Sequence, residues 1–476
     1  MGNKAYVKGL VVQFANMAQD AIAFSIYDGQ QVIDISYPQF AADILKAAGY
    51  FTQNNIHRQH VGLLASSSYE WMVAFFAISL AGNTVVTINP DLPPKLLEET
   101  LTFTDVSVVC ADHNQYKDGL NDTGINWVTF ADLNEFEASE QPFFYDWAPD
   151  DTWIMACTSG TTGKSKTIEY SIENVFSFFP DMEEVYDNSR NGLLVVIPLH
   201  HAYGLIGALC ELYFGFCICI GRGSLYMMAD MPVLNPFYIQ TVPAALESIV
   251  KLLKDAKTEA ERQKYIGKNL KRVTVSGAAS NPAVCQYLMN IGIIVENTYG
   301  MTEATGPAAR CELTENNLTT IGKPHGKTQM RIKDGEIQFK SPRVMKGYYK
   351  DPEATAAIIE DGWLHTGDLG YCDEDGYYYI TGRKKNVIIL SNGENVNPEE
   401  IEATFANCDA IEESLVYSDG KGICADVFTK ERDTVAAFIK KYNKSMPMYR
   451  QVYKVNYTEE PLPKTSSGKI KRKENK

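Results

Sequence analysis

The stretch TSGTTGKSK at positions 158–166 has the residue types that could bind a phosphate. Its glycines allow successive backbone N–H groups to point into one concavity, and its hydroxyl and lysine side chains can surround a polyphosphate. A strand-like run at 153–157 precedes it, and we predict that a helix begins near Ser171. The alternative is a polar surface loop, but the lysines and the preceding strand favour a phosphate site.

A P-loop NTPase is the first class of protein to compare with this stretch. The P-loop pattern G-x-x-x-x-G-K-[ST] fits Gly163, Lys164 and Ser165, but its first glycine would fall at Thr158. The match is therefore incomplete, and a P-loop NTPase stays an alternative that the other motifs must decide.

Composition narrows the classes of function. The chain has 476 residues, 45% hydrophobic and 22% charged, and a formal net charge of −15, which argues against a broad nucleic-acid-binding face. Its cysteines form no C-x-x-C and no zinc spacing, which is typical of a reducing compartment, so we expect a cytoplasmic protein. The most apolar region, 193–220, contains Pro198, two histidines and Glu211, which argues against a membrane span.

Hydrophobic patterning positions this stretch within a layered αβ fold. Buried strand patterns alternate with helical periodicity, which favours parallel sheets covered by helices on both faces. Strands are predicted at residues 61–65, 84–88, 106–110, 193–197, 217–220, 273–275 and 293–295. Helices are predicted from about residue 37 to 50, at 70–81 and at 243–253. A further helix is predicted to follow the strand at 193–197 and to end near residue 214.

After about residue 328, the alternation of strand and helix patterns gives way to a pattern of antiparallel strands. Asp334-Gly335 lies between alternating runs and predicts a β-hairpin, and residues 373–376 predict a second one. The predicted fold class is therefore α/β, with a large N-terminal domain of two αβ-layered sheets plus an antiparallel β subdomain. A small, mobile C-terminal α+β domain follows. We place these domains at residues 1–382 and 383–476.

Four further motifs have a chemical character that matches the glycine-rich stretch. Residues 297–303, NTYGMTE, follow a strand and can begin a helix; their Thr and Glu suit a phosphate and its Mg²⁺. Residues 366–368, TGD, present a carboxylate after a glycine turn, as a ribose diol requires. GRKK at 382–385 lies at the inferred domain junction, and Gly468-Lys469 presents a lysine near the end. Taken singly, each could be an ordinary turn or a solvated tail.

Together, the order and spacing of these motifs resemble those of the adenylate-forming superfamily of acyl-CoA synthetases, adenylation domains and luciferases. The resemblance covers essentially the whole chain, and Tyr37 and Ala81-Gly82 fit the weaker early motifs. It implies an AMP-forming carboxylate–thiol ligase that uses ATP and Mg²⁺ to make an acyl-adenylate. The acyl group would then pass to coenzyme A or, alternatively, to the phosphopantetheine of an acyl carrier protein.

The resemblance also implies roles for individual residues. Lys469 would bridge the substrate carboxylate and the α-phosphate, Thr302 would touch that phosphate, Glu303 would hold Mg²⁺, and His201 would lie near the acyl pocket. Lys385 would occupy the hinge position, and Gly393 would let pantetheine pass. The remaining expected nucleotide contacts are Thr158, Ser159, Gly160, Thr161, Thr162, Gly163, Lys166, Gly277, Ala278, Asn297, Tyr299, Gly300, Asp368 and Arg383.

The sequence says less about which carboxylic acid is the substrate and which thiol is the acceptor. Residues 198–204, PLHHAYG, match the family's acyl-pocket region but contain no acidic side chain to pair with a substrate ammonium, so we expect a small carboxylic acid without an α-amino group. His200 replaces the usual aromatic neighbour, and Tyr203 would narrow the pocket toward an aryl or modest acyl group. Ser165 stands where the family loop usually has proline. The last domain is short, which favours a carrier-protein acceptor more than the family pattern alone would.

Overall fold

The computed structural model describes residues 6–113, 120, 124–137, 144–157, 166–185, 192–390, 394–464 and 470–473. The chain forms two compact units: Met1–Gln329 with Lys340–Leu364, and Met330–Phe339 with His365–Lys476. The domain boundary that we place between Gly382 and Arg383 stays a prediction. Within the described residues, none of the helices combines the length and apolar character needed to cross a bilayer.

One sheet of the first unit is built around the strand that precedes the glycine-rich stretch. Its strand order is β18 (Gly347–Tyr348), β8 (Thr167–Ser171), β7 (Thr152–Cys157), β4 (Thr84–Ile88), β3 (His60–Leu64), β5 (Val106–Ala111), β6 (Asn126–Thr129). Strands β7, β4, β3, β5 and β6 are parallel, and β8 and β18 add antiparallel pairs at one edge.

The other large sheet of this unit has a parallel centre and antiparallel edges. Its strand order is β15 (Lys323–Pro324), β14 (Ala309–Glu312), β13 (Ile294–Tyr299), β12 (Arg272–Val275), β11 (Tyr238–Thr241), β9 (Leu193–Leu194), β10 (Ile218–Ile220), β1 (Ile22–Tyr27), β2 (Val32–Ser36). The antiparallel pairs are β13 with β14 and β14 with β15 at one edge, and β1 with β2 at the other.

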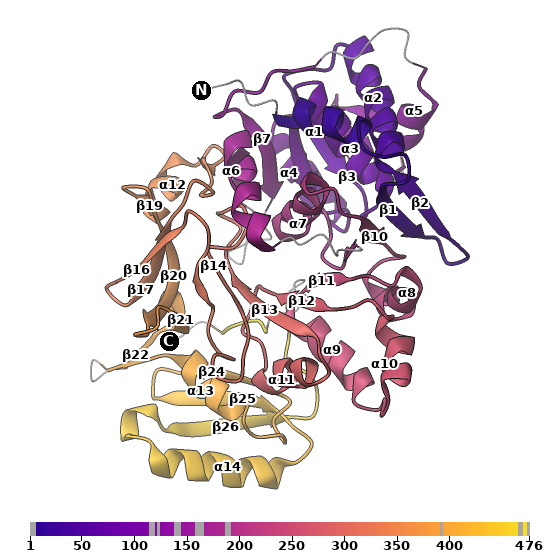
Figure 1. Ribbon diagram of the computed structural model, residues 1–476. Coiled ribbons are helices and arrows are strands. Elements are labelled where there is room, and N and C mark those ends of the chain that lie inside the picture. The colour runs from indigo at the N-terminus through magenta and orange to yellow at the C-terminus, as the bar shows by residue number, and fades with distance from the viewer. Residues whose placement is uncertain are drawn as a thin grey trace. The chain divides into compact units, whose positions relative to one another are not determined.

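Helices cover both faces of the sheets, as predicted (Figure 1). A central core holds residues of both sheets and of α1 (Tyr6–Ala15), α2 (Tyr37–Gln53), α3 (Tyr69–Leu80), α5 (Phe130–Glu135), α6 (Ile172–Phe176) and α7 (Ala202–Tyr213). The outer faces are covered by α4 (Pro94–Phe103) on one sheet, and on the other by α8 (Met227–Leu234), α9 (Pro243–Leu253), α10 (Glu259–Ile266) and α11 (Pro282–Asn290). Helix α12 (Pro352–Ile358) follows β18.

Both predicted hairpins are present. β16 (Gln329–Lys333) and β17 (Glu336–Lys340) flank Asp334 and Gly335, whose φ angles of 53° and 76° are those of a type I′ turn. β20 (Trp363–Cys372) pairs with β21 (Tyr378–Arg383) and, at its start, with β19 (Ile359–Glu360).

The end of the chain forms the predicted α+β arrangement. Its strands are β22 (Ile388–Ile389) and β23 (Asn395–Val396), followed by the sheet β24 (Glu413–Ser418), β25 (Ile423–Phe428), β26 (Val452–Thr458). Helices α13 (Pro398–Phe405) and α14 (Arg432–Ser445) pack on one shared core with these strands (Figure 1).

Two local predictions were wrong, and one strand was missed. The strand predicted at 193–197 is only β9, Leu193–Leu194. The helix predicted near Ser171 is confirmed, because α6 begins at Ile172 with Ser171 as its N-cap, but the strand β8 that precedes it and pairs with β7 was not predicted. Residues 297–303 begin no helix, because β13 continues to Tyr299 and turns back into the antiparallel strand β14.

Candidate active site

The glycine-rich stretch connects the two strands of a hairpin. Thr158, Ser159, Gly160, Thr161, Thr162 and Gly163 lie outside the described residues, but both flanks are described. Cys157 at the end of β7 pairs with Thr167 at the start of β8. A P-loop leads from a strand into a helix, whereas this loop leads into an antiparallel strand, so the P-loop alternative does not fit.

Lys166 and Glu303, two of the predicted site residues, meet the same tyrosine. The Nζ of Lys166 lies 4.2 Å from the ring centroid of Tyr348, and the hydroxyl of Tyr348 donates a 2.6 Å hydrogen bond to Oε1 of Glu303. Tyr348 is on β18, which pairs with β8 beside the end of the loop. The fold therefore brings a cation and a carboxylate, 137 positions apart in sequence (303 − 166), to one point.

Backbone contacts hold the turn that carries Thr302 and Glu303. The hydroxyl of the fully buried Tyr170 on β8 donates to the carbonyl oxygen of Thr302. The amide of Met345 donates to the Glu303 carbonyl oxygen at 2.9 Å, and the amide of Thr305 donates to the Arg343 carbonyl oxygen at 2.9 Å. Thr302 itself is exposed, so the turn is held through its backbone while the Thr302 side chain faces solvent.

The adenine-site candidates lie at the ends of β12 and β13. Gly277 and Ala278 are exposed residues just after β12, and Gly277 has a φ of 86°. The Ser276 hydroxyl donates to the Thr298 carbonyl oxygen at 2.9 Å, which ties the two strand ends together. Asn297 lies opposite Val275 in the register of β12 and β13.

Two predicted site residues on β13, Asn297 and Tyr299, are buried. Asn297 Nδ2 donates to the carbonyl oxygen of Thr320 at 2.6 Å, and Tyr299 is 7% exposed. A Cβ at position 300 would lie 3.1 Å from the carbonyl oxygen of Gly306, a tight contact that Gly300 avoids. These residues shape the strand end, while Gly277 and Ala278 remain accessible.

The two histidines of the expected acyl pocket stand at the start of α7. Their ring centroids are 4.3 Å apart, and His201 is the N-cap residue of the helix. The Thr87 hydroxyl at the end of β4 donates to the His200 carbonyl oxygen at 3.1 Å. Burial and the neighbouring His201 lower the pKa of His200 to about 3, and burial also lowers the pKa of His201, so both imidazoles are neutral near pH 7.

These groups share one feature of the topology. The glycine-rich loop follows β7, Thr87 is near the end of β4, and Gly277 and Tyr299 mark the ends of β12 and β13. In open αβ sheets, ligands bind outside the carboxyl ends of the parallel strands. Gly277 and Tyr299 therefore lie at strand ends of the kind where open αβ sheets bind ligands.

The second unit contains a buried carboxylate that pairs with a partly exposed guanidinium. Asp368 on β20, with a side chain 4% exposed, lies opposite Arg383 on β21, and its Oδ1 is 2.6 Å from the Arg383 Nε. The Asp368 amide donates to the Thr366 hydroxyl at 3.0 Å, and that hydroxyl donates to the Ile337 carbonyl oxygen at 2.6 Å. The predicted TGD motif is thus a fixed structure on a strand.

Other predicted residues of this unit are less constrained. Lys385 is exposed in the short 3₁₀ turn Lys384–Asn386. Gly393 and Lys469 lie outside the described residues. Arg472 pairs with Glu402 at 2.6 Å, and Lys473 with Asp426 at 2.5 Å, so these two basic side chains are engaged within their own unit.

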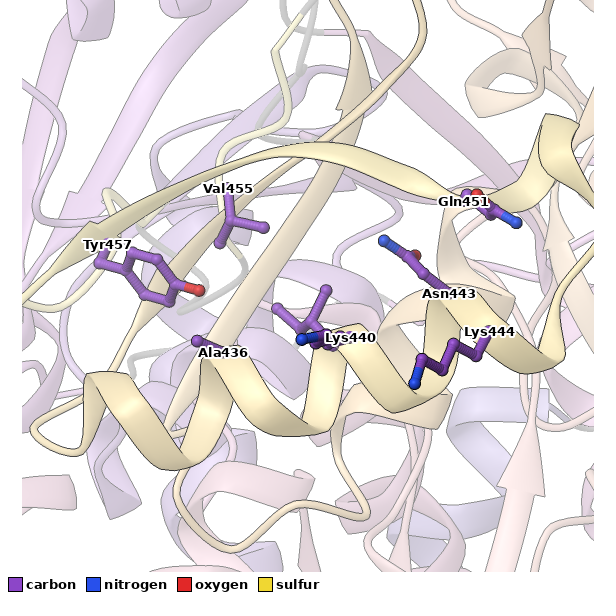
Figure 2. Close-up of a pocket in the computed structure, with 8 residues that line it drawn as sticks. Ala436, Lys440, Asn443, Lys444, Gln451, Val455 and Tyr457 are labelled. Atoms are coloured by element: carbon purple, nitrogen blue, oxygen red, sulfur yellow. The ribbon is translucent and has the colours of Figure 1, made fainter.

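A hollow of about 410 Å³ lies elsewhere in the second unit, between α14 and β26 (Figure 2). Ala436, Lys440, Asn443 and Lys444 line it from the helix, and Gln451, Val455 and Tyr457 from β26 and its approach. The Asn443 side chain donates a hydrogen bond to the Val452 carbonyl oxygen at 2.8 Å and accepts one from the Val452 amide at 2.9 Å. None of the predicted site residues that the structure describes lines this hollow, so we do not place the reaction there.

Sequence patterns alone missed Tyr348 and Tyr170. Both are placed by strand pairing across large sequence separations, and neither belongs to a recognised spacing. The only signal was the aromatic pair Tyr348-Tyr349 after Gly347, which by itself is typical of a buried strand.

Comparison with known proteins supports the same reading of the chain. Residues 11–349 match the AMP-binding enzyme family, and residues 385–476 match the AMP-binding enzyme C-terminal domain. The protein belongs to the AMP-binding enzyme family. The predicted superfamily, its fold class and an AMP-forming acid–thiol ligase activity are thereby confirmed.

Individual relatives match over nearly their full length. The chain is 27% identical to 2-succinylbenzoate–CoA ligase of Geobacillus sp. (strain WCH70) over 97% of this chain and 95% of the relative. Among solved structures, o-succinylbenzoate CoA synthetase of Bacillus subtilis with an acyl-adenylate intermediate gives a TM-score of 0.84 at 22% identity, covering 97% and 96% of the two chains. The same enzyme with ATP and magnesium ion gives 0.81 at 22% identity, covering 97% and 98%.

Proposed function

We propose that this ligase uses ATP, Mg²⁺ and coenzyme A to convert a carboxylic acid without an α-amino group into its thioester, with AMP and pyrophosphate as products. The observation that carries the proposal is that Lys166 and Glu303 both contact Tyr348, beside the end of the glycine-rich loop. A cation for phosphate oxygens and a carboxylate for Mg²⁺ are the two charges that a bound Mg·ATP requires.

The donor set near Glu303 fits Mg²⁺ bound jointly with a nucleotide. Among the described residues, no group of three or more His, Cys, Asp or Glu side chains could hold a metal alone. Mg²⁺ usually keeps waters and is held by one or two carboxylates together with substrate phosphates. Glu303 would be that carboxylate, and Thr302 beside it would contact the α-phosphate.

We propose that the other predicted residues complete the nucleotide site. Thr158, Ser159, Gly160, Thr161, Thr162 and Gly163 would surround the β- and γ-phosphates together with Lys166. Adenine would lie against Gly277 and Ala278, at strand ends shaped by Asn297, Tyr299 and Gly300. The ribose hydroxyls would bind Asp368, whose orientation is fixed by Arg383 at 2.6 Å.

The chemistry explains why so many cations and donors are needed. The substrate carboxylate and the triphosphate are both anions, so their repulsion must be neutralised before the carboxylate attacks the α-phosphorus. Lys469 would do this, and fixed charges at phosphoryl oxygens lower the barrier further. Positioning alone can contribute about 7–11 kcal/mol when two bound reactants meet.

The second half-reaction would use the small domain differently. An acyl-adenylate hydrolyses readily, so water must be kept out until the thiol arrives. We propose that the C-terminal domain first delivers Lys469 and then turns about Lys385, so that pantetheine passes Gly393. The thiol would reach the adenylate near His201, whose neutral imidazole can accept a proton.

For the acid, we propose an aromatic carboxylic acid. Residues 198–204 contain no acidic side chain, which disfavours an amino acid because a buried ammonium would stay unpaired. The named relatives act on 2-succinylbenzoate, which carries an aromatic ring. Tyr203 would limit the length of the acyl group, which also favours a compact ring.

The test is ATP–pyrophosphate exchange across a panel of acids that includes 2-succinylbenzoate, benzoates, short aliphatic acids and amino acids. We expect exchange with aromatic acids and not with amino acids. Mass spectrometry with coenzyme A and with a phosphopantetheinylated carrier protein then identifies the thiol. Exclusive loading of the carrier would overturn the coenzyme A proposal, and no exchange with any acid would indicate a nucleotide-binding protein without turnover.

A further inference from the structure

Tyr348 contacts both charged groups of the proposed Mg·ATP site, with different parts of its side chain. The face of the ring receives the ammonium of Lys166, with Nζ 4.2 Å from the ring centroid, and the hydroxyl donates to Oε1 of Glu303 at 2.6 Å. Aromatic faces attract cations and phenol hydroxyls donate strong hydrogen bonds to carboxylates, so both contacts are favourable.

The backbone of Tyr348 is fixed on two sides. It pairs with Ile168 of β8, and its amide donates to the hydroxyl of Thr355 on α12 at 2.8 Å. The side chain is 7% exposed. Burial and the bond to Glu303 raise the pKa of the Tyr348 hydroxyl, so it stays protonated and remains a donor. The ring is therefore a rigid support for both charges.

We propose that Tyr348 is a positioning residue that directs Oε2 of Glu303 toward the nucleotide-bound Mg²⁺ and holds Lys166 beside the phosphates. This inference rests on the proposed function. A carboxylate whose first oxygen is held in place presents its second in a defined direction, and partners of this kind set the metal affinity of the ligand that they hold. The Lys166 ammonium makes a cation–π contact with the face of the ring, and the Glu303 carboxylate accepts a hydrogen bond from the hydroxyl. The two charged groups therefore contact different parts of the same side chain.

Three variants separate these two actions. Tyr348→Phe keeps the ring and removes the hydroxyl, and Tyr348→Leu removes both contacts. Tyr349→Phe is the matched control, because it removes the same hydroxyl from the next residue, where the bond goes to the surface carboxylate of Asp105 at 2.5 Å.

The first readout is the ATP-induced rise in melting temperature of the full chain, titrated with Mg²⁺ and repeated in EDTA; it needs no acid substrate. Tyr348→Phe is expected to raise the Mg²⁺ concentration for half-maximal stabilisation roughly tenfold, with stabilisation by ATP in EDTA unchanged. Tyr348→Leu is expected to weaken the stabilisation in EDTA as well. Tyr349→Phe should match the parent protein in both.

The second readout is the Mg²⁺ dependence of pyrophosphate exchange, where Tyr348→Phe should shift the Mg²⁺ requirement and leave the KM for the acid unchanged. A Tyr348→Phe titration that overlays that of Tyr349→Phe overturns the inference, as does equal weakening with and without Mg²⁺. If the parent protein itself shows no Mg²⁺-dependent stabilisation by ATP, the proposed function fails first, and the inference with it.

Discussion

Asp368→Asn tests the proposed ribose contact with the smallest possible change in shape. Asp368 is 3% exposed, and its Oδ1 lies 2.6 Å from the Nε of Arg383. The hydrogen bond from its amide to the Thr366 hydroxyl does not involve the side chain, so the turn persists in the variant. The substitution removes the negative charge and replaces one acceptor oxygen by an amide donor.

The expected magnitudes follow from these contacts. A hydrogen bond to a charged group contributes about 1.5–3 kcal/mol, so losing one carboxylate–ribose bond should raise the KM for ATP about 10- to 150-fold. The cost in stability should be smaller, about 1 kcal/mol, because the Arg383 side chain is 46% exposed and water can replace its partner. Nucleotide binding is therefore expected to change more than the melting temperature does.

The assay is pyrophosphate exchange with ATP, 2′-deoxy-ATP and 3′-deoxy-ATP for the parent protein, Asp368→Asn and the exposed control Asp375→Asn. If Asp368 binds the ribose hydroxyls, removing a hydroxyl and changing the carboxylate must be non-additive. The deoxy-nucleotides should then be poor for the parent and the control, but nearly equal to ATP for Asp368→Asn. Additive losses would refute the contact, even if the KM for ATP rises.

Three further outcomes are expected. Lys469→Ala should abolish adenylate formation while sparing thioester formation from a supplied adenylate, and Lys385→Ala should do the reverse; equal losses in both half-reactions contradict these roles. Glu296→Leu should lower the free energy of unfolding by about 3–5 kcal/mol in urea titration, because it leaves the buried Arg310 without its carboxylate. For Glu336, burial raises the pKa, but the bonds from Gly367 and His365 outweigh it and lower the pKa from 4.5. Its stabilising contribution is therefore present above pH 4.5 and lost as the pH falls through the lowered value, so the melting temperatures of Glu336→Gln and the parent should converge at low pH.

Local sequence signals predicted the elements that are determined by their own residues. Helix α3 runs from Tyr69 to Leu80 and ends before Gly82, whose φ of 77° is the left-handed conformation that terminates helices. Asp334 and Gly335 form the predicted turn because both can take positive φ. In these cases the conformational preference and the boundary are contained in a few adjacent residues.

The errors arose where a distant strand decides the local structure. The strand at residues 167–171 was not predicted, and it forms β8 by pairing with β7 on one side and with β18 on the other. The resemblance to a family similarly assigned Lys166 and Glu303, but not the tyrosine that both contact. This contact depends on how β8 and β18 align, although Lys166 and Tyr348 are 182 positions apart (348 − 166). A motif of a few adjacent residues cannot predict it.

Lys166 and Glu303 are positioned by contacts outside the glycine-rich loop. Tyr170 and Tyr348 lie on neighbouring antiparallel strands, and one bonds the Thr302 carbonyl oxygen while the other bonds the Glu303 carboxylate. Both hydroxyls are held by sheet pairing, so the Thr302–Glu303 turn is positioned by β8 and β18. In the proposed nucleotide site, Lys166 and Glu303 would keep these positions when a triphosphate binds, which is the preorganisation that electrostatic stabilisation of a transition state requires.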